Sequence, residues 1–481
     1  MSLNHLYLRE FPTFTSDNPR TNIRRIQDYI DSSHVNLVLS IDKAIPKIEQ
    51  IKNNGFKGSI ICVSAKDSLS RFSRMFYTLK NPTPKHPIIS WNDFLMKGDE
   101  VKFKRASYRR DRVAVIVYTG GTTGTPKAAM LTNDTMNIIA HQYRYLGADY
   151  NRTQNFLNIM PPFIAYGITC GIHMPLTLGL NDVLIPLFDP NKFDDLMIKY
   201  KPSHFLGVPS HYDSLSKSEK MRDFDLSFLE SAGAGGDAIS IEIEKKINDF
   251  LKLHGSKYSI AKGYGMTEVG SAAVASHGNI NKLGSAGIPH CNTTVSVFEP
   301  NSERELNYYE VGEICISTPA MMLGYLNDEE ATKEVLREHN DGNVWVHSND
   351  LGYMDEDGFV FINGRMKRMI IRPDGHNVFP ALIENTIDTH YAVEKCAVVG
   401  KADKDSSRGE YPVAYIVLKK EFKREKGRLT DIEEYCSERI PPRDTAVEFF
   451  EIDELPLTEI GKIDYRALEA LAGAASPQHI N

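Results

Sequence analysis

Residues 113–127 read VAVIVYTGGTTGTPK, an apolar run followed directly by a loop of glycine, threonine and lysine. The run is typical of a buried strand. Glycines let backbone N–H groups turn inward, hydroxyls add donors and the lysine adds a cation, so the loop predicts a polyphosphate site. It is not a Walker loop, because no register supplies Gly, four residues and Gly-Lys-Ser/Thr, and a plain hairpin turn needs neither four threonines nor a lysine. The candidate phosphate-binding residues are Thr119, Gly120, Gly121, Thr122, Thr123, Gly124 and Lys127.

Similar apolar runs recur on both sides of this stretch, with longer helix-compatible segments between them. They read VNLVLS (35–40), GSIICVS (58–64) and NDVLIP (181–186). The alternation predicts an α/β protein whose large N-terminal domain has mostly parallel sheets flanked by helices.

After Arg365 the sequence changes to short alternating strands, a charged helical stretch at 430–440 and a tail with little to bury. This pattern of short strands and a charged helix predicts a small, mobile α+β C-terminal domain. The predicted division is an N-terminal domain over residues 1–364, a C-terminal lid domain over 365–472 and a flexible tail over 473–481.

The composition excludes several classes of protein. The 481 residues carry a net charge of −7 with 41% hydrophobic residues, which argues against a nucleic-acid partner and against disorder. The six cysteines form no CxxC pair, so neither a zinc ribbon nor a disulfide framework is indicated, and a reducing cytoplasm fits best. The first ten residues do not resemble a signal peptide.

Two segments could be interpreted as contacts with a membrane. Residues 153–181 contain no charged side chain apart from histidine, but prolines and glycines interrupt them, so we interpret them as buried core rather than a transmembrane helix. Residues 66–112 carry twelve basic and five acidic side chains interleaved with aromatic ones. This segment is either a solvated connector or a weak contact with an anionic membrane surface or a phosphate-rich ligand.

Further motifs follow the loop, and each has chemical meaning by itself. Residues 263–268 read GYGMTE, whose carboxylate is the kind of ligand that Mg²⁺ prefers, although a glutamate at a helix start is common without any ligand. Asp350 follows a strand-like run and can accept hydrogen bonds from both ribose hydroxyls. Arg365 can reach nucleotide oxygens, but a surface ion pair is the more common role of an arginine. Lys462, presented by a glycine, could neutralise charge that develops on a phosphate.

Together these motifs resemble the adenylate-forming superfamily of acyl-CoA synthetases, nonribosomal peptide adenylation domains and luciferases, whose loop usually reads YTSGTTGxPKG. The loop and four further motifs occur in the family's order, and the resemblance runs from about Asn18 to Leu468. The remaining motifs are GEI (312–314) with GYL (324–326), DLGY (350–353) with GR (364–365), and PLT (456–458) with GKID (461–464).

The resemblance implies a two-step reaction that uses ATP, Mg²⁺ and CoA. A carboxylate attacks the α-phosphate of ATP to give acyl-AMP and pyrophosphate, and a thiol then attacks the adenylate. The family pattern assigns catalysis to Lys462, Thr267 and Glu268, the Mg²⁺ ion to Glu268 and the hinge of the lid to Lys367. It assigns ATP, besides the phosphate loop, to Gly233, Ala234, Gly235, Tyr264, Gly265, Met266, Asp350 and Arg365.

The acid substrate is expected to be apolar. Amino-acid-activating members place an aspartate in the region that here reads MPPFIAYG (160–167), and burying an ammonium group without such a counter-charge costs several kcal/mol. Many acyl-CoA synthetases carry a histidine where Ile164 stands. The leading hypothesis is a ligase that joins a fatty or other apolar acid to CoA. The alternatives are transfer to a carrier-protein thiol, or an inactive remnant that only binds ligands.

The front of the chain departs from the family, whose members usually place well over a hundred residues before the strand at 113–118. The recognisable pattern here begins only near Asn18. We therefore expect an N-terminal domain shortened at its front, with an unpaired sheet edge and exposed apolar side chains on strands such as 35–40. We also expect poor solubility or weak activity of the chain by itself.

Overall fold

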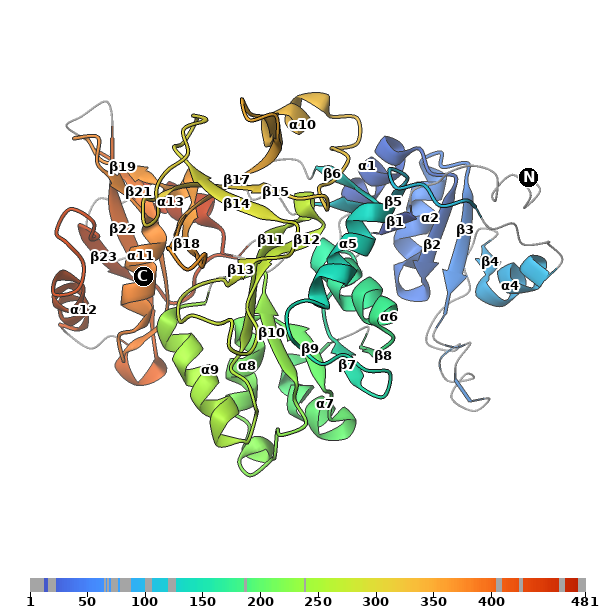
Figure 1. The fold of residues 1–481 in the computed structure, drawn as a ribbon, viewed down its shortest axis with the longest axis horizontal. Coiled ribbons are helices and arrows are strands. Elements are labelled where there is room, and N and C mark those ends of the chain that lie inside the picture. Colours follow the sequence, from blue (N-terminus) through green and yellow to red (C-terminus); the bar gives the residue numbers. More distant parts are fainter. Residues whose placement is uncertain are drawn as a thin grey trace.

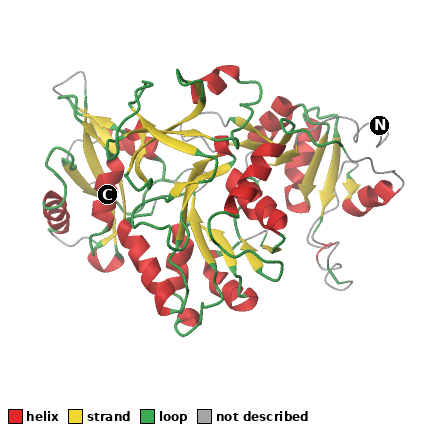
Figure 2. Cartoon of the chain, in the orientation of Figure 1, coloured by secondary structure: helices red, strands yellow, loops and turns green. Residues whose placement is uncertain are grey.

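The computed structural model describes residues 13–15, 23–64, 66, 69–70, 77, 88–99, 106–119, 127–185, 188–237, 239–403, 409–423, 427–457 and 463–474. Figure 2 shows the strands gathered into separate sheets with helices beside them. Among the described residues, no helix has the length and apolar character needed to cross a membrane.

The largest sheet has seven strands in the order β13-β12-β11-β10-β9-β7-β8. Five of them run parallel, and β12 and β13 complete the sheet in antiparallel orientation. Glycine and alanine dominate β10 and β11, so backbone rather than side chains forms much of that surface. The strands are β7 (Asn155–Asn158), β8 (Asn181–Leu184), β9 (His204–Gly207), β10 (Ser231–Gly235), β11 (Ala261–Met266), β12 (Ser271–Ala275) and β13 (Ile288–Pro289).

Three helices pack against this sheet through a buried cluster that includes Phe193, Phe205 and Ile247. The longest of them has isoleucine, phenylalanine and leucine at helical spacing on its buried face, and the side chain of Ser240 accepts the backbone N–H of Ile243 to cap its start. The helices are α7 (Phe193–Tyr200), α8 (Pro209–Ser216) and α9 (Ile241–Leu253).

The predicted phosphate-loop strand is β5 (Val113–Tyr118), and its bounds match the apolar run. It pairs in parallel with β1 (Thr13–Thr15) and in antiparallel with β6 (Ala128–Thr132). Helix α5 (Asn133–Tyr143) follows β6 directly, because Thr132 and Thr135 form a reciprocal capping box at its start.

The stretch 153–181 is buried core, as predicted. It forms β7, a π-helical segment (Tyr166–His173) and the short helix α6 (Met174–Leu178). Cys170 and Met174 are at most 1% exposed. The helical run is continuous from the π-helical segment into α6, and the left-handed Gly179 ends it.

The N-terminal part is a three-stranded parallel sheet in the order β2-β3-β4, with the predicted strands at 35–40 and 58–64 in its first two positions. Leu39 and Ile41 on β2 are 57% and 45% exposed, as expected for an apolar strand at a sheet edge. The elements are α1 (Ile23–Ser33), β2 (Leu37–Ile41), α2 (Ile45–Asn53), β3 (Ser59–Val63), β4 (Ile89–Ser90) and α4 (Trp91–Asp99).

A second sheet, antiparallel throughout, lies between the large sheet and the C-terminal part, and the sequence pattern did not predict it. Its order is β14-β15-β17-β16, with β18 on the far part of β17. Strand β17 is long enough to pair with three neighbours. The elements are β14 (Thr294–Phe298), β15 (Gly312–Ser317), α10 (Glu329–Val335), β16 (Leu336–Glu338), β17 (Val344–Met354) and β18 (Val360–Arg365).

The C-terminal part has its own sheets and cores. Two buried clusters draw only on residues from Ile370 onward, which favours the predicted boundary near Arg365. The predicted helix at 430–440 is α12. The elements are β19 (Ile370–Ile371), β20 (Asn377–Val378), α11 (Pro380–Asp388), β21 (Val393–Ala402), β22 (Glu410–Leu418), α12 (Arg428–Ser437), β23 (Glu448–Glu451) and α13 (Tyr465–Ala474).

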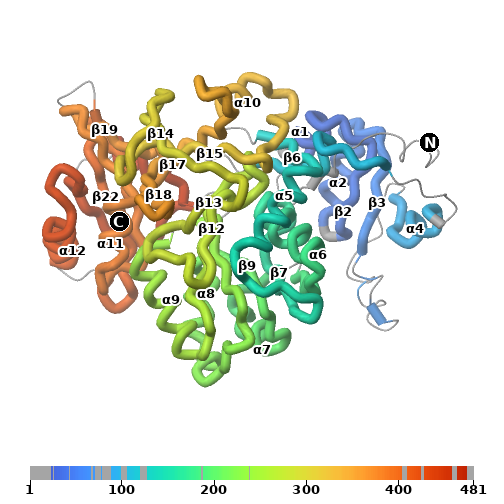
Figure 3. The backbone as a smooth tube through the Cα atoms, viewed as in Figure 1, coloured from blue at the N-terminus to red at the C-terminus, as the bar shows by residue number. Residues whose placement is uncertain are grey.

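Figure 1 shows the β2–β4 sheet at one end of the long axis and the β21–β23 sheet at the other, with the large sheet and the antiparallel sheet between them. The tube in Figure 3 continues in orange from β18 directly into the C-terminal part. The end of β18 is therefore the place where the chain leaves the central body.

Candidate active site

Strands β10 and β11 form a bare backbone surface at their carboxyl ends. Gly233, Ala234 and Gly235 pair in register with residues 261–263. A Cβ atom at Gly235 would lie 3.2 Å from the carbonyl oxygen of Gly263 and 3.7 Å from the hydroxyl of Tyr166. These three residues, which the resemblance assigns to ATP, are buried at the carboxyl end of β10, and we call them the platform; the Tyr166 hydroxyl lies beside Gly235.

The GYGMTE motif continues from this surface into a tight turn. Gly265 tolerates no side chain, because a Cβ atom there would lie 1.8 Å from the carbonyl oxygen of Ser271 on β12. After Met266 the chain enters the 3₁₀ turn Thr267–Val269, and the left-handed Gly270 ends it. This turn puts the half-buried Thr267 and the buried Glu268 next to the end of β11.

Tyr325 connects Glu268 with the lysine of the phosphate loop. Its hydroxyl donates to Oε1 of Glu268 at 2.5 Å, and the ammonium of Lys127 lies 5.1 Å from the centre of its ring. Burial and the Glu268 carboxylate raise the pKa of the Tyr325 hydroxyl, so it stays protonated and acts as a donor. Tyr325 holds this place because it pairs with Ala129 of β6.

The two ends of the phosphate loop are held together. The backbone N–H of Thr119 donates to the carbonyl of Lys127 at 2.8 Å, and the N–H of Lys127 donates to the Thr119 hydroxyl at 3.3 Å. The ammonium of Lys127 is also 3.9 Å from Glu334, a half-exposed and therefore weak ion pair. The predicted loop residues Gly120, Gly121, Thr122, Thr123 and Gly124 lie outside the described residues.

Asp350 is the most deeply placed charge of the site. Its side chain is 7% exposed; Oδ2 accepts from the Tyr264 hydroxyl at 2.7 Å and Oδ1 lies 2.8 Å from Nε of Arg365. Burial raises the pKa of the Asp350 carboxyl, although Arg365 and Tyr264 act in the opposite direction. Each carboxylate oxygen accepts two hydrogen bonds, so both retain capacity for the hydroxyls of a ligand.

The predicted hinge, Lys367, is exposed and lies in a 3₁₀ turn (Met366–Arg368) directly after β18. Arg368 beside it is held firmly: its guanidinium is 2.5 Å from Glu384 and stacks 3.6 Å from the ring centre of Tyr465. The chain is therefore anchored to the C-terminal part immediately after Lys367.

The predicted catalytic Lys462 lies outside the described residues, but both ends of its loop are described. Leu457 and Ile463 form a β-bridge that closes the base of the loop. Tyr465, at the start of α13, has its pKa raised by burial, and the carboxylates of Glu384 and Asp237 add to that effect.

A continuous series of contacts thus runs from Thr119 through Lys127, Tyr325 and Glu268 to the turn after β11, and from Tyr264 to Asp350 and Arg365. Sequence reasoning missed the roles of Tyr325 and Tyr166. Tyr325 stood inside a motif, but its contacts come from pairing with β6. For Tyr166, the π-helical conformation of its segment was not apparent from the sequence.

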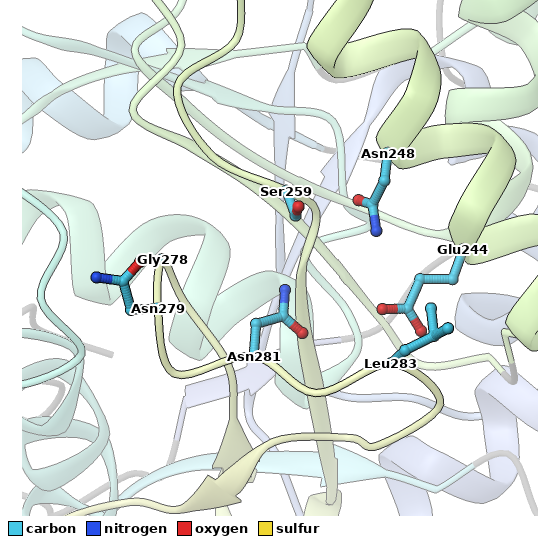
Figure 4. A pocket seen from close by; sticks show the side chains of 7 residues that line it. All are labelled: Glu244, Asn248, Ser259, Gly278, Asn279, Asn281 and Leu283. Carbon is cyan, nitrogen blue, oxygen red and sulfur yellow. The ribbon is translucent and has the colours of Figure 1, made fainter.

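A polar hollow of about 410 Å³ lies elsewhere, and none of the predicted site residues lines it. It lies between α9 and the loop after β12, near Ser259, which precedes β11 (Figure 4). Since the candidate site occupies the carboxyl end of β11, the hollow lies at the opposite end of that strand. The buried Glu244 at its wall pairs with Lys262 and accepts the backbone N–H of Gly284.

Comparison with known proteins agrees with this geometry. The family described as AMP-binding enzyme matches residues 16–326, and the AMP-binding enzyme C-terminal domain matches residues 382–462. The long-chain-fatty-acid–CoA ligase of Bacillus subtilis is 31% identical over 467 residues, which cover 94% of this chain and 80% of that protein. The 4-coumarate–CoA ligase CCL1 of Humulus lupulus is 27% identical over 468 residues, 95% of this chain and 79% of that protein.

Among solved structures, ATP-bound MatB from Rhodopseudomonas palustris superposes with a TM-score of 0.78 at 21% identity, over 94% of this chain and 82% of that one. At this identity the likeness shows the fold alone. The chain belongs to the AMP-binding enzymes, the adenylate-forming family that its motifs predicted. The predicted α/β fold and the class of AMP-forming acid–thiol ligase, with ATP, Mg²⁺ and CoA, are confirmed.

Replacing Asp350 by asparagine should not lower the stability of the fold at pH 7. A raised pKa means that the ionised carboxylate is disfavoured in the folded state; the stabilisation exists below the unfolded pKa and is lost as pH rises through the folded value. Asparagine removes the charge, so the melting temperature at pH 7 should be equal to or above that of the wild type. The difference should shrink toward acidic pH.

Asp355, which directly follows β17, is the matched control for the Asp350 substitution. Burial raises its pKa, but Lys282 and the backbone N–H groups of Phe359 and Asp357 outweigh this and hold the pKa below its usual value. Asp355→Asn should therefore lower stability at pH 7, by about 1 kcal/mol or more. Thermal melts of both variants between pH 4 and pH 7 test the pair, and a larger loss for Asp350→Asn would contradict the assignment.

Proposed function

We propose that this chain activates an apolar carboxylic acid, a fatty acid in the first instance, with ATP and transfers the acyl group to the thiol of CoA. The observation that carries the proposal is the convergence of the platform, the Glu268–Tyr325–Lys127 contact and the buried Asp350 around the end of β11. These groups supply a surface for adenine, a cation for phosphates and an acceptor for ribose. We place the enzyme in the cytoplasm, in accord with six free cysteines.

The protein contributes positioning and electrostatics rather than a covalent nucleophile. Asp350 accepts from the ribose hydroxyls, Arg365 lies beside it, and Thr119 and Lys127 hold the phosphates together with the loop between them. Thr267 orients the reacting oxygens. Lys462 stabilises the charge that develops on the α-phosphate as the acid's carboxylate attacks and pyrophosphate leaves. The thiol then attacks the acyl carbon, and AMP leaves.

The chemistry of the donor groups fits a Mg²⁺ ion. Glu268 offers a hard carboxylate in a buried turn next to the phosphate loop, and the adjacent Thr267 offers a hydroxyl. Glu268 would hold such an ion, which would neutralise phosphate charge when bound. Tyr325 keeps the carboxylate oriented through its hydrogen bond to Oε1.

The preference for an apolar acid rests on the segment beside the platform. Residues 160–167 carry no acidic side chain, and Met160 and Ala165 within them are 7% and 3% exposed. An ammonium group placed there would lack a counter-charge, which costs several kcal/mol. The name of the Bacillus subtilis relative, a long-chain-fatty-acid–CoA ligase, supports the same class of acid.

Release of pyrophosphate from ATP with a panel of carboxylic acids tests the function. Medium- and long-chain fatty acids should stimulate release, whereas amino acids should not, and CoA should yield the thioester. Comparison of CoA with a phosphopantetheinylated carrier protein decides the acceptor. If no acid stimulates release while ATP still binds, the chain is a binding protein, not a ligase.

Lys462→Ala should abolish the first half-reaction selectively. One preorganised charge on the transition state is worth a factor of about 10² or more, so pyrophosphate release should fall by at least that factor. Thioester formation from a supplied acyl-adenylate should continue near the wild-type rate. Equal loss of both half-reactions would show that Lys462 has a different role.

Glu268→Gln should keep the fold and lose Mg²⁺-dependent adenylation, because the amide has nearly the same shape but lacks the charge that Mg²⁺ prefers. Titration of activity against Mg²⁺ should show a requirement shifted to higher concentrations. Tyr325→Phe is the companion variant: it leaves the carboxylate in place without its donor, so its shift should be smaller. Wild-type turnover of Glu268→Gln at low Mg²⁺ would identify Glu268 as a capping residue only.

A further inference from the structure

A buried polar cluster lies beneath Asp350, between β15 and β17, and the mechanism above does not use it. Glu313, His347 and His339 are 3%, 2% and 7% exposed. Nδ1 of His347 lies 2.9 Å from Oε2 of Glu313, and Nε2 of His347 lies 2.9 Å from Nε2 of His339. Buried polar groups of this kind are costly unless their hydrogen bonds are complete, so the cluster calls for an explanation.

The cluster is connected to the backbone that carries Asp350. The second oxygen of Glu313, Oε1, accepts the backbone N–H of Asn349 at 3.0 Å. The Ser348 hydroxyl donates to the carbonyl of Ile314 and accepts the N–H of Asp350 at 2.9 Å. Glu313 therefore fixes the residue immediately before Asp350 from below.

This backbone is irregular and needs such support. Glu313 pairs with Leu351 whereas Cys315 pairs with His347, so residues 348–350 of β17 face a single residue of β15. Within this bulge Asn349 has a φ of +58°, a left-handed conformation that asparagine tolerates better than most residues. A bulge aims a side chain in a direction that a regular strand would not permit, and here the side chain is Asp350.

The chemistry of the groups determines which of them donates each hydrogen bond in the chain from His339 through His347 to Glu313. A carboxylate only accepts, so His347 donates from Nδ1 to Glu313; with a neutral ring its Nε2 then accepts from the N–H of His339. Cys315, whose Sγ is 3.6 Å from Nδ1 of His347, adds a potential metal ligand. However, burial and the Glu313 carboxylate raise the pKa of that thiol, and Glu313 and His347 already have partners in the protein, so a hydrogen-bonded relay explains the cluster better than a metal ion.

We propose that Glu313 is a positioning residue for nucleotide recognition: held by His347 and His339, its carboxylate fixes the β17 bulge that presents Asp350 to the ribose hydroxyls of ATP. The inference rests on the proposed function, in which Asp350 is the ribose acceptor. It predicts that Glu313 acts on the ribose part of binding and leaves the contributions of adenine and phosphate in place.

The test measures equilibrium binding of ATP, 2′-deoxy-ATP and 3′-deoxy-ATP to the full chain by calorimetry. The ratio of dissociation constants, deoxy-ATP over ATP, isolates the ribose contact. A lost hydrogen bond to a charged acceptor corresponds to about tenfold or more, so the wild type should show a ratio of that size. Glu313→Ala should bring both ratios close to one, whereas binding of 2′,3′-dideoxy-ATP, which lacks both hydroxyls, should change little.

Glu244→Ala is the matched control. Glu244 is likewise a buried glutamate (1% exposed) that accepts a backbone N–H, from Gly284 at 3.0 Å, but it lies at the other end of β11. It should destabilise the protein in a similar way and leave the ribose ratio at the wild-type value. A ratio lowered equally by both variants would show a general loss of stability and overturn the proposal.

Glu313→Gln decides the matter even where Glu313→Ala does not fold. The amide oxygen still accepts from Asn349, but the hydrogen bond loses its charge assistance and His347 must change tautomer, so the ratio should fall by about threefold. An unchanged ratio in this variant, with a wild type that discriminates, overturns the positioning role alone. A wild type that binds ATP and deoxy-ATP equally removes the role of Asp350 itself, and the inference with it.

Discussion

A carboxylate buried where two sheets meet governs the arrangement of the site. The side chain of Asp350 is 7% exposed, and the Tyr264 hydroxyl and the Arg365 guanidinium offset only part of the cost of burying its charge, since the pKa of the carboxyl remains raised. A charge kept at a net cost is characteristic of functional sites. It also ties the layers together, because Tyr264 comes from β11 of the large sheet and Arg365 from the last strand before the lid. The nucleotide side of the pocket is built around this one group.

The backbone around Asp350 depends on two positions where the chain takes a conformation or makes an approach that most side chains would not permit. Gly265 allows β11 and β12 to meet at a distance that no Cβ atom would permit, so the chain turns there and places Thr267 and Glu268 at the end of β11. Asn349 plays the equivalent part on β17, where the backbone takes a left-handed conformation with a φ of +58°. Asparagine is among the few residues other than glycine that adopt this conformation at modest cost, so it permits the geometry that presents Asp350.

The sequence was sufficient for features that depend on neighbouring residues. The strand at 113–118 was predicted to the residue, because six consecutive apolar side chains followed by a glycine-rich loop leave little choice. The antiparallel sheet of β14–β18 was not predicted, since its register depends on contacts such as Glu313 with His347, 34 residues apart. Likewise the bond from Tyr325 to Glu268 joins residues 57 apart, and local periodicity carries no information about such pairs. The motifs identified the residues of the site, while distant pairing determined their contacts.

The proposed hinge lies between two arginines, one that contacts the N-terminal part of the chain and one that contacts the C-terminal part. Arg365, the last residue of β18, is held by Asp350, and Arg368, three residues later, is held by Glu384 of the lid and stacks on Tyr465. Between these two anchors lies the exposed Lys367, whose side chain can follow a change in backbone torsion without breaking a buried contact. A rotation at this position would leave Asp350 and the platform unchanged while it moved Glu384, Tyr465 and the rest of the C-terminal part. We infer the hinge from these two charged anchors, one on each side of a single exposed residue.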